Sequence, residues 1–263
     1  MTNNTMIRIT RLSKPTILQQ NELRWTEELC LARRQYYQKL EDYNHGRLTS
    51  PPSKPNAIKS RYAHQEIKTA LEMMFGPKCA YCESPVTAVS YQHVEHFRPQ
   101  SIYPKLAYNW NNLLLACPRC NSGHKKARFP LMDRSQPVEN VTNPCLLDDS
   151  DNNALIDPCR DEPEEFFEFQ DEWLVCRSNN FRASQTRDVC GLNRDDLRGE
   201  RKKVLTLVEA VAKAFMFITD DSNKRILART LQKATQSSAN YAAMSRTKLA
   251  KLNITPAEIE SFL

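Results

Sequence analysis

Two cysteine pairs, each with two residues between its members, are the part of this sequence whose spacing most directly indicates chemistry. Cys79 and Cys82 form the first pair, and Cys117 and Cys120 form the second. Two intervening residues allow a tight turn that brings both sulfurs of a pair to one ion, and two such turns complete a tetrahedral set of four thiolates, which suits zinc. Four protein ligands leave no open position for a substrate, so we expect this zinc ion to be structural.

The 34 residues between the two pairs, 83–116, carry the pattern of two strands. Residues 91–99 alternate polar and apolar side chains and end at a proline, and the apolar run 113–116 can pair with them. A helix is predicted to open around Pro118. We therefore expect a ββα unit in which the zinc ion holds the base of a hairpin against a helix.

Within this frame the sequence resembles the HNH endonuclease family. The family signature is an acidic residue and a histidine at the end of the first strand, an asparagine before the second strand, and a final asparagine or histidine on the helix. Glu95, His96, Asn112 and Asn121 stand at these positions, and the second cysteine pair ends in the form C-x-x-C-N. The resemblance implies that the chain hydrolyses phosphodiester bonds.

The chemistry of phosphodiester hydrolysis gives each of these residues an expected role. A neutral imidazole is a suitable base near pH 7, so His96 is expected to activate the attacking water. A hard divalent ion prefers oxygen ligands, so Glu95 and Asn121 are expected to hold magnesium, with manganese as the alternative. Asn112 is expected to fix the hairpin loop through hydrogen bonds and so to orient His96.

Two features depart from the family pattern. Glu95 stands where many members have aspartate, and residues 100–107 replace the glycine-rich loop that is common after the first histidine. Adjacent residues of a strand also face opposite sides, so Glu95 and His96 can share a site only if the strand bends before Pro99. These departures concern the positioning of the substrate more than the class of reaction.

Positive charge is concentrated in the same part of the chain. Residues 97–128 contain six Lys and Arg and no Asp or Glu, which suits a polyanion such as nucleic acid, although a solvated surface loop would have the same composition. His124 is either an auxiliary ligand beside Asn121 or a solvated residue, and His93 is either a structural histidine or a group behind Glu95. The residues expected to contact nucleic acid are Arg98, Arg119, Lys125, Lys126 and Arg128.

Short segments along most of the chain are similar to one subfamily, the PtuB-type HNH nucleases associated with retrons and Septu systems. These segments are RWTEE at 24–28, KCAYCE at 78–83, EHFRP at 95–99, PRCN at 118–121 and CGLNR at 190–194. The subfamily works in bacterial anti-phage defence beside an ATPase, PtuA, so the resemblance implies a hetero-oligomer with an ATPase of that type. In a retron setting, a reverse transcriptase with its msDNA would join the assembly. The helical flanks would then be docking surfaces for the ATPase.

Two other functions stay open. The same nuclease could act on structured RNA such as tRNA, because one basic groove and one metal do not distinguish RNA from DNA. Alternatively, the cysteine frame is a non-catalytic zinc module that binds nucleic acid or a partner protein. The intact set of Glu95, His96 and Asn121 favours a nuclease, and DNA is the expected substrate.

The rest of the pattern is mainly helical, so we expect a mainly α protein, of the α+β type, with helical flanks around a small ββα core. Only 5 glycines and no apolar run long enough to cross a bilayer indicate a protein without a membrane segment. The first 14 residues lack the apolar core of a signal peptide, so a cytoplasmic location is expected. The expected organisation is an N-terminal helical region over 1–76, the zinc-framed core over 77–130, a loop-rich acidic segment with a small hairpin over 131–190, and a C-terminal helical region over 191–263.

Apolar periodicity predicts the individual helices of the two flanks. The first begins near Ser13 and continues to Tyr43, and the second covers 58–75. In the C-terminal region one helix follows residue 193, another covers 223–245, and a last one begins after Thr255, which forms a capping box with Glu258.

Residues 148–172 stand out because they contain eleven acidic residues and one arginine. One interpretation is a solvated loop. The other is a segment that mimics nucleic acid and screens the active site until activation.

Overall fold

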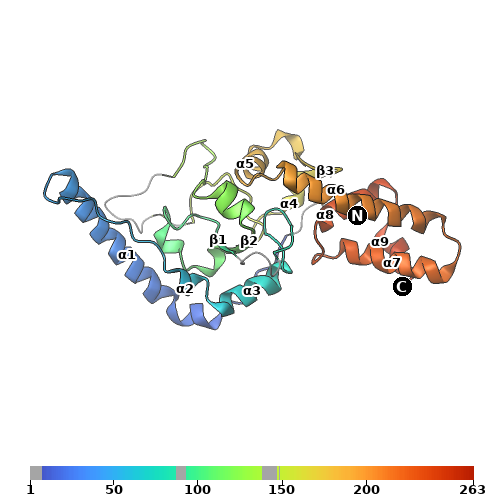
Figure 1. Cartoon of the computed structure of the whole chain (residues 1–263), viewed down its shortest axis with the longest axis horizontal. Helices are drawn as coiled ribbons and strands as arrows, with labels where there is room; N and C mark the ends of the chain where they lie inside the picture. The colour runs from blue at the N-terminus through green and yellow to red at the C-terminus, as the bar shows by residue number, and fades with distance from the viewer. Residues whose placement is uncertain (1–7, 87–92, 138–146, 148) are drawn as a thin grey trace.

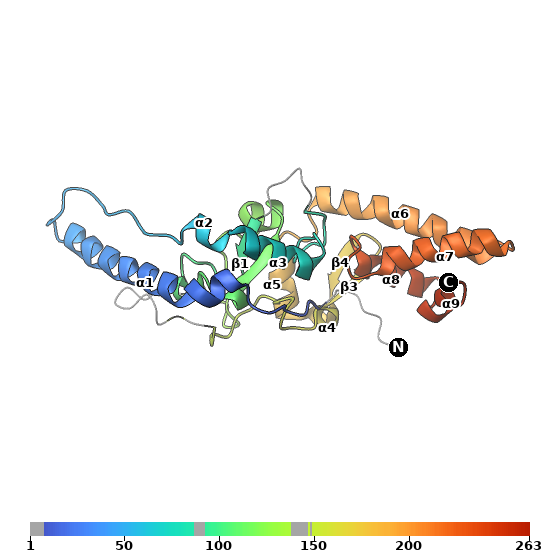
Figure 2. The same ribbon diagram turned by 90° about the horizontal axis from the view of Figure 1, so that it is seen from below.

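The computed structural model describes residues 8–86, 93–137, 147 and 149–263 of the chain. These residues form an elongated, mainly helical molecule with two small two-stranded sheets (Figure 1). Helix α1 (Thr16–Asn44) lies at one end, a group of C-terminal helices lies at the other, and the first sheet lies between them (Figures 1 and 2). The fold class expected from the sequence, mainly α with a small ββα core, is confirmed.

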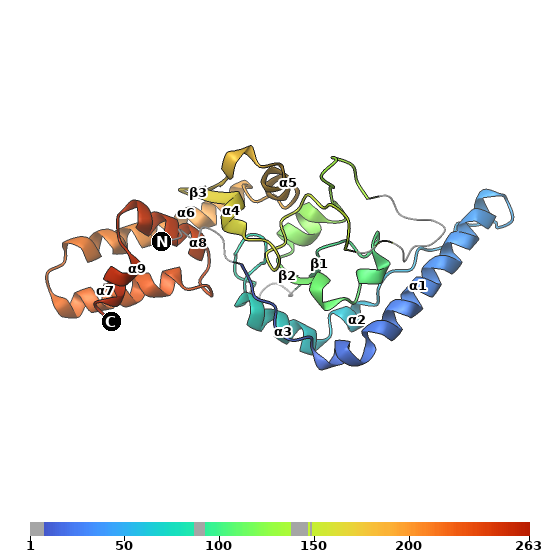
Figure 3. The ribbon, with the colours of Figure 1, turned by 180° about the vertical axis from the view of Figure 1, so that it is seen from behind.

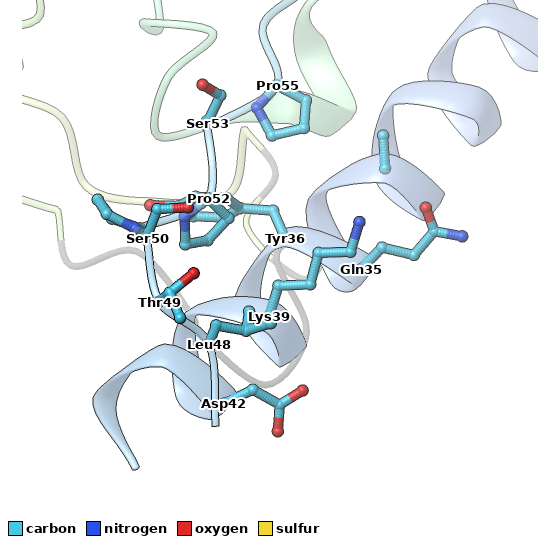
Figure 4. A pocket seen from close by; sticks show the side chains of 12 residues that line it. Gln35, Tyr36, Lys39, Asp42, Leu48, Thr49, Ser50, Pro52, Ser53 and Pro55 are labelled. Carbon is cyan, nitrogen blue, oxygen red and sulfur yellow. The ribbon is translucent and has the colours of Figure 1, made fainter. Parts of the chain in front are cut away.

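Helix α1 begins directly after Pro15 and buries Leu18, Trp25 and Leu29 against the core. Beyond the helix the chain turns back and runs beside its last turns, as Figure 4 shows. Together they enclose an open groove with a volume of about 600 Å³, lined by Tyr36, Lys39 and the prolines of residues 51–55.

The single helix expected over 58–75 is in fact two helices, α2 (Lys59–Tyr62) and α3 (Gln65–Phe75). His64 separates them, because its backbone is extended and its imidazole accepts a hydrogen bond from the backbone amide of Glu66 at 3.3 Å. This bond caps α3, an effect that apolar periodicity does not reveal. Helix α3 ends at Gly76, whose φ of 58° is the left-handed conformation that glycine adopts readily.

The ββα unit predicted between the cysteine pairs is present. Strand β1 (His93–His96) pairs antiparallel with β2 (Leu113–Ala116), and residues 91 and 92 of the expected strand lie outside the described residues. Two 3-10 turns, η1 (Pro104–Leu106) and η2 (Trp110–Asn112), fill the long connection. The helix of the unit, η3 (Arg119–Lys125), is a π-helix, in which the amide of Lys126 bonds to the carbonyl of Asn121 at 2.7 Å. Such helices are rare and are frequently found at functional sites.

The middle of the chain packs on this unit. Its elements are α4 (Pro163–Phe166), the hairpin β3 (Phe167–Gln170) and β4 (Trp173–Cys176), η4 (Arg177–Asn179) and α5 (Phe181–Val189). In the acidic segment, Asp151 pairs with Arg98 at 2.6 Å and the side chain of Asp157 is buried. The interpretation of this segment as a solvated loop is therefore wrong for these residues, because they are anchored on the core.

The C-terminal helices gather at one end of the molecule (Figure 3). Their buried side chains form a second hydrophobic cluster besides the main one. Helix α6 (Asp195–Phe217) belongs to both clusters, since Leu197 and Leu205 lie in the main core while Val208 and Phe215 lie in the second. Helices α7 (Asp221–Thr235), α8 (Ala242–Lys251) and α9 (Pro256–Glu260) complete this end of the molecule. Helix α6 thus connects the two cores physically.

The helix expected over 223–245 is also divided, into α7 and α8. The ammonium group of Lys78 donates hydrogen bonds to the carbonyls of Ser237 and Ala239 at 2.6 and 3.0 Å, and these residues lie in the break. Tyr241, with a φ of 53°, redirects the chain into α8, and its hydroxyl lies 2.9 Å from that of Ser84. A continuous helix could not offer these carbonyls, because it would use them internally.

The predicted cap of the last helix is confirmed, because Thr255 Oγ1 accepts a hydrogen bond from the amide of Glu258 at 3.1 Å. None of the helices in the described part of the chain is long and apolar enough to cross a membrane.

Candidate active site and metal centre

The four predicted zinc ligands converge on one point. The sulfur atoms of Cys79, Cys82, Cys117 and Cys120 all lie within 4.8 Å of one another, and all four residues are buried. The amide of Cys120 donates to the sulfur of Cys117 at 3.4 Å, a contact that stabilises a thiolate. Four buried thiols that converge in this way fit a tetrahedral zinc ion, so the predicted metal-binding cluster is confirmed.

His96, the predicted base, lies at the end of β1 and is almost completely buried. Its Nε2 atom is 2.8 Å from the backbone carbonyl of Ala107, in the connection between the strands. Because a carbonyl can only accept, Nε2 carries the proton and Nδ1 keeps a free electron pair. Burial lowers the pKa of His96 to about 4, so the imidazole is neutral at pH 7.

Asn112 lies in η2, at the base of the same connection. Its side-chain oxygen accepts from the amide of Arg98 at 2.8 Å, and its side-chain nitrogen donates to the carbonyls of Arg98 and Leu106 at 3.0 Å each. Leu106 directly precedes Ala107, which holds the His96 ring. Asn112 therefore ties the segment after β1 to the carbonyl that orients the imidazole.

Glu95 lies under the surface and is paired with Lys125, whose side chain is completely buried. The ammonium nitrogen is 2.7 Å from Glu95 Oε1 and also donates to the backbone carbonyl of His96 at 3.1 Å. The hydroxyl of Tyr81 donates to the same carboxylate oxygen at 3.4 Å. Burial raises the pKa of Glu95, and the positive charge of Lys125 opposes this effect.

The donor set suits a hard divalent ion. The carboxylate of Glu95 is a hard oxygen donor, and the contacts from Lys125 and Tyr81 both use its Oε1 atom. The amide oxygen of Asn121, which is half-buried on the π-helix, is a donor of the same hard type. The side chains of Glu95 and His96 have different hydrogen-bond partners, as the alternation along a strand requires, while Lys125 joins the two residues by contacting the Glu95 carboxylate and the His96 carbonyl.

Two further histidines, His124 and His93, were expected as auxiliary groups of the active site. His124 is half-buried on the π-helix and packs against Gly191, where a Cβ atom would lie only 2.3 Å from the ring nitrogen Nδ1. Burial lowers the pKa of His124, and Arg194 and Arg128 lower it further. His93 begins β1, and its side chain lies outside the described part of the structure.

The expected basic surface is smaller than the sequence indicates. Arg98 and Lys125 are buried and paired with Asp151 and Glu95, so neither can contact a phosphate group in this structure. Their assignment to nucleic-acid binding is corrected, and the reason is that each charge neutralises an acidic residue inside the core. Arg119, Lys126 and Arg128 are exposed.

Lys125 and its exposed neighbour Lys126 allow a matched test of the buried pair. We expect Lys125→Met to lower the free energy of unfolding by about 3–5 kcal/mol, because it leaves the carboxylate of Glu95 buried without a cation. Lys126→Met should change it by less than about 0.5 kcal/mol. Urea unfolding followed by circular dichroism measures both values.

The double variant Glu95→Gln, Lys125→Met is the internal control for this prediction. It removes both charges, so it should recover most of the stability that Lys125→Met loses. Equal stabilities for the Lys125 and Lys126 variants would show that the buried pair does not stabilise the fold.

Tyr62 is a residue of the site that the sequence pattern did not single out. The centroid of its ring lies 4.7 Å from the centroid of the His96 imidazole, with an angle of 73° between the two ring planes. Helix α2, which is separated from α3 by the His64 cap, carries Tyr62 to this position. The N-terminal helical region therefore contributes a side chain to the site, and no local sequence signal predicts this contact.

Comparison with known proteins agrees with this geometry. The HNH endonuclease family matches residues 79–127, from Cys79 to two residues beyond the π-helix. This part of the chain belongs to the HNH endonuclease family.

The most informative relatives are proteins of the Septu systems. The chain is 34% identical to Septu protein PtuB of Bacillus mycoides (strain KBAB4) over an alignment of 165 residues, covering 56% of this chain and 54% of that protein. It is 34% identical to Septu protein PtuB of Bacillus thuringiensis over 131 residues, covering 49% and 42%. It also matches Septu protein PtuA of Bacillus mycoides, at 26% identity over 152 residues, covering 52% and 20%. The chain spans about half the length of the PtuB relatives and is of the PtuB type in the part that matches.

Proposed function

We propose that this protein is a metal-dependent HNH endonuclease that hydrolyses phosphodiester bonds, with DNA as its substrate. One observation carries the proposal: a neutral imidazole, His96, is held by the Ala107 carbonyl at the end of β1, directly after a carboxylate. A base that is uncharged at pH 7 is what the activation of water requires. A module that only binds nucleic acid needs no such residue.

In the proposed reaction, Nδ1 of His96 takes the proton of the attacking water, since Nε2 is used in the bond to Ala107. Asn112 keeps this carbonyl in place through its bond to Leu106. Magnesium, or manganese in its place, would be held by Glu95 and Asn121 and would neutralise the charge that develops on the leaving oxygen. Water and an anionic phosphate would raise the pKa of His96 on entering, because they relieve the desolvation that lowers it.

The cover over the base supports the proposal that a partner controls the enzyme. His96 is only 7% exposed, and the ring of Tyr62 lies against it. In the proposed mechanism, α2 moves and Tyr62 leaves the imidazole before the substrate enters. Such an enzyme is inactive until another protein displaces this helix.

We further propose that the chain is the effector nuclease of a bacterial anti-phage defence system and that an ATPase of the PtuA type controls it. The similarity to PtuB supports this role. Exposed apolar side chains on α6 and α7, Leu207, Phe217 and Ile226, are consistent with a partner-binding surface on the C-terminal helices.

The deciding experiment is a cleavage assay on supercoiled plasmid DNA and on total RNA, with magnesium, manganese or a chelator. The chain is tested alone and with the PtuA-type ATPase from its own operon, and His96→Gln serves as the inactive control. We expect cleavage of DNA that requires the divalent ion, increases with the ATPase, and is lost in the variant.

Each other outcome would assign a different function to this protein. Cleavage of RNA alone would assign structured RNA as the substrate. Equal results for wild type and His96→Gln on both substrates would leave a non-catalytic zinc module. Copurification of a reverse transcriptase with its msDNA would place the chain in a retron.

A further inference from the structure

The segment Cys190-Gly-Leu-Asn-Arg194 has no part in the proposed reaction, yet it lies against the zinc ligands. Arg194 donates one hydrogen bond from its guanidinium to Cys120 Sγ at 3.4 Å and makes a longer contact with Cys82 Sγ at 3.9 Å. It therefore contacts one sulfur from each of the two cysteine pairs. We infer that Arg194 is the cationic partner of the zinc–thiolate centre and that it couples zinc binding to the docking of the C-terminal helices.

The electrostatic argument concerns the excess charge of the centre. A zinc ion with four thiolates carries two surplus negative charges, and burial of such a centre is costly unless nearby donors compensate it. The sulfur atoms of Cys82 and Cys120 belong to buried residues. The side chain of Arg194 is only 11% exposed, and its Nε atom also pairs with the more exposed Asp196 at 3.1 Å. Hydrogen bonds between a cation and an anion are about twice as strong as neutral ones, so the contact with the sulfur atoms stabilises the loaded state.

The turn that carries Arg194 is fixed on both sides. The guanidinium also donates to the carbonyl of Gly191 at 3.0 Å, which closes the turn on itself. Gly191 has a φ of 60°, and His124 of the π-helix occupies the space that a Cβ atom would need. The turn therefore contacts both the zinc ligands and the helix that carries Asn121.

Helix α6 begins immediately after this turn, with Arg194 as the residue that precedes its first turn. Arg201, which lies seven residues further along α6, is buried and donates a hydrogen bond to the carbonyl of Leu192 at 2.7 Å. Since α6, like α8, belongs to both hydrophobic clusters, the position of the turn contributes to how the second cluster sits on the first. Loss of zinc would release the thiolates that Arg194 binds, and by reciprocity loss of Arg194 must weaken zinc binding.

The test uses the full chain loaded with zinc and measures zinc affinity by competition with a chromophoric chelator. We expect Arg194→Gln to raise the dissociation constant of zinc roughly 10–100-fold, the usual effect of removing a group that contacts metal ligands. Arg194→Lys keeps the positive charge but loses the planar pair of N–H donors. Its dissociation constant for zinc should lie between those of Arg194→Gln and the wild type.

Arg198 is the matched control, because it lies one turn further along α6 and contacts Trp173 and the Asn193 carbonyl rather than a cysteine. Arg198→Gln should leave the dissociation constant of zinc within about threefold of the wild type. Equal losses of affinity for Arg194→Gln and Arg198→Gln would overturn the inference, because they would show a general loosening of α6. An unchanged affinity in Arg194→Gln would overturn it as well.

Hydrogen exchange of the wild-type chain tests the coupling without any variant, and so decides the matter if the variants do not fold. Removal of zinc is expected to increase exchange at residues 190–198 as well as at the cysteine turns. Exchange that increases at 77–84 and 117–125 while 190–198 stay protected would contradict the coupling. Neither measurement involves cleavage, so both outcomes are independent of the proposed nuclease function.

Discussion

Cys79→Ser is expected to abolish stoichiometric zinc binding and to unfold the part of the chain between residues 77 and 130. The apparent binding energy of a structural zinc ion is about 10–16 kcal/mol in small zinc domains, which exceeds the stability of most single domains. Here the four sulfur ligands are themselves part of the main hydrophobic cluster, so the ion and the core form together. Zinc content by mass spectrometry and the thermal unfolding midpoint measure the effect.

Cys176→Ser is the control for this prediction. Cys176 is half-buried on β4 and lies outside the four-cysteine cluster, so its replacement should leave the zinc content at one ion per chain. Chelation of zinc from the wild type should reproduce the Cys79→Ser phenotype. A Cys79→Ser protein with a full zinc content and an unchanged unfolding midpoint would contradict the assignment of the ligands.

His96→Gln is expected to reduce the rate of DNA cleavage about 10²–10⁴-fold, the typical contribution of a general base. Glutamine can still donate to the Ala107 carbonyl, so the connection between the strands should remain in place. His45→Ala is the matched control, because His45 is exposed beyond the end of α1 and its imidazole bonds to the carbonyl of Glu41, away from the site. Its cleavage rate should equal that of the wild type.

The pH dependence of kcat/KM gives a second readout, because this parameter reports the free enzyme. Cleavage requires the neutral imidazole, and burial lowers the pKa of His96 to about 4, so activity should persist as the pH falls from 7 to about 5.5. An imidazole with an ordinary pKa of about 6.5 would lose roughly tenfold over this range. A loss of that size, with the fold intact by circular dichroism, would show that His96 is not buried in the free enzyme.

The features that the sequence predicted correctly depend on short-range spacing. The two cysteine turns, the pairing of β1 with β2 and the cap at Thr255 each require only a few neighbouring residues. The position of Asn112 next to the base follows from the same hairpin. In each case the local geometry of the chain leaves few alternatives.

The features that it missed depend on contacts between distant segments. Tyr62 reaches His96, and Arg194 reaches Cys82, only because whole helices pack against the core. Lys125 was expected at the surface because lysine is nearly always exposed, and only the fold shows that it faces Glu95. The break between α7 and α8 likewise has its cause at Lys78, more than 150 residues earlier in the chain.

Helix α6 gives the molecule a mechanical property. A helix of 23 residues is about 35 Å long. This helix is held at its start because Arg194, which precedes its first turn, bonds to Cys120. With that end as a pivot, a tilt of about 5° moves the far end by roughly 3 Å, in proportion to the length of the helix. The helix therefore acts as a lever. A displacement of about 3 Å at its far end corresponds to a rotation of only about 5° at its first turn, beside the four cysteines.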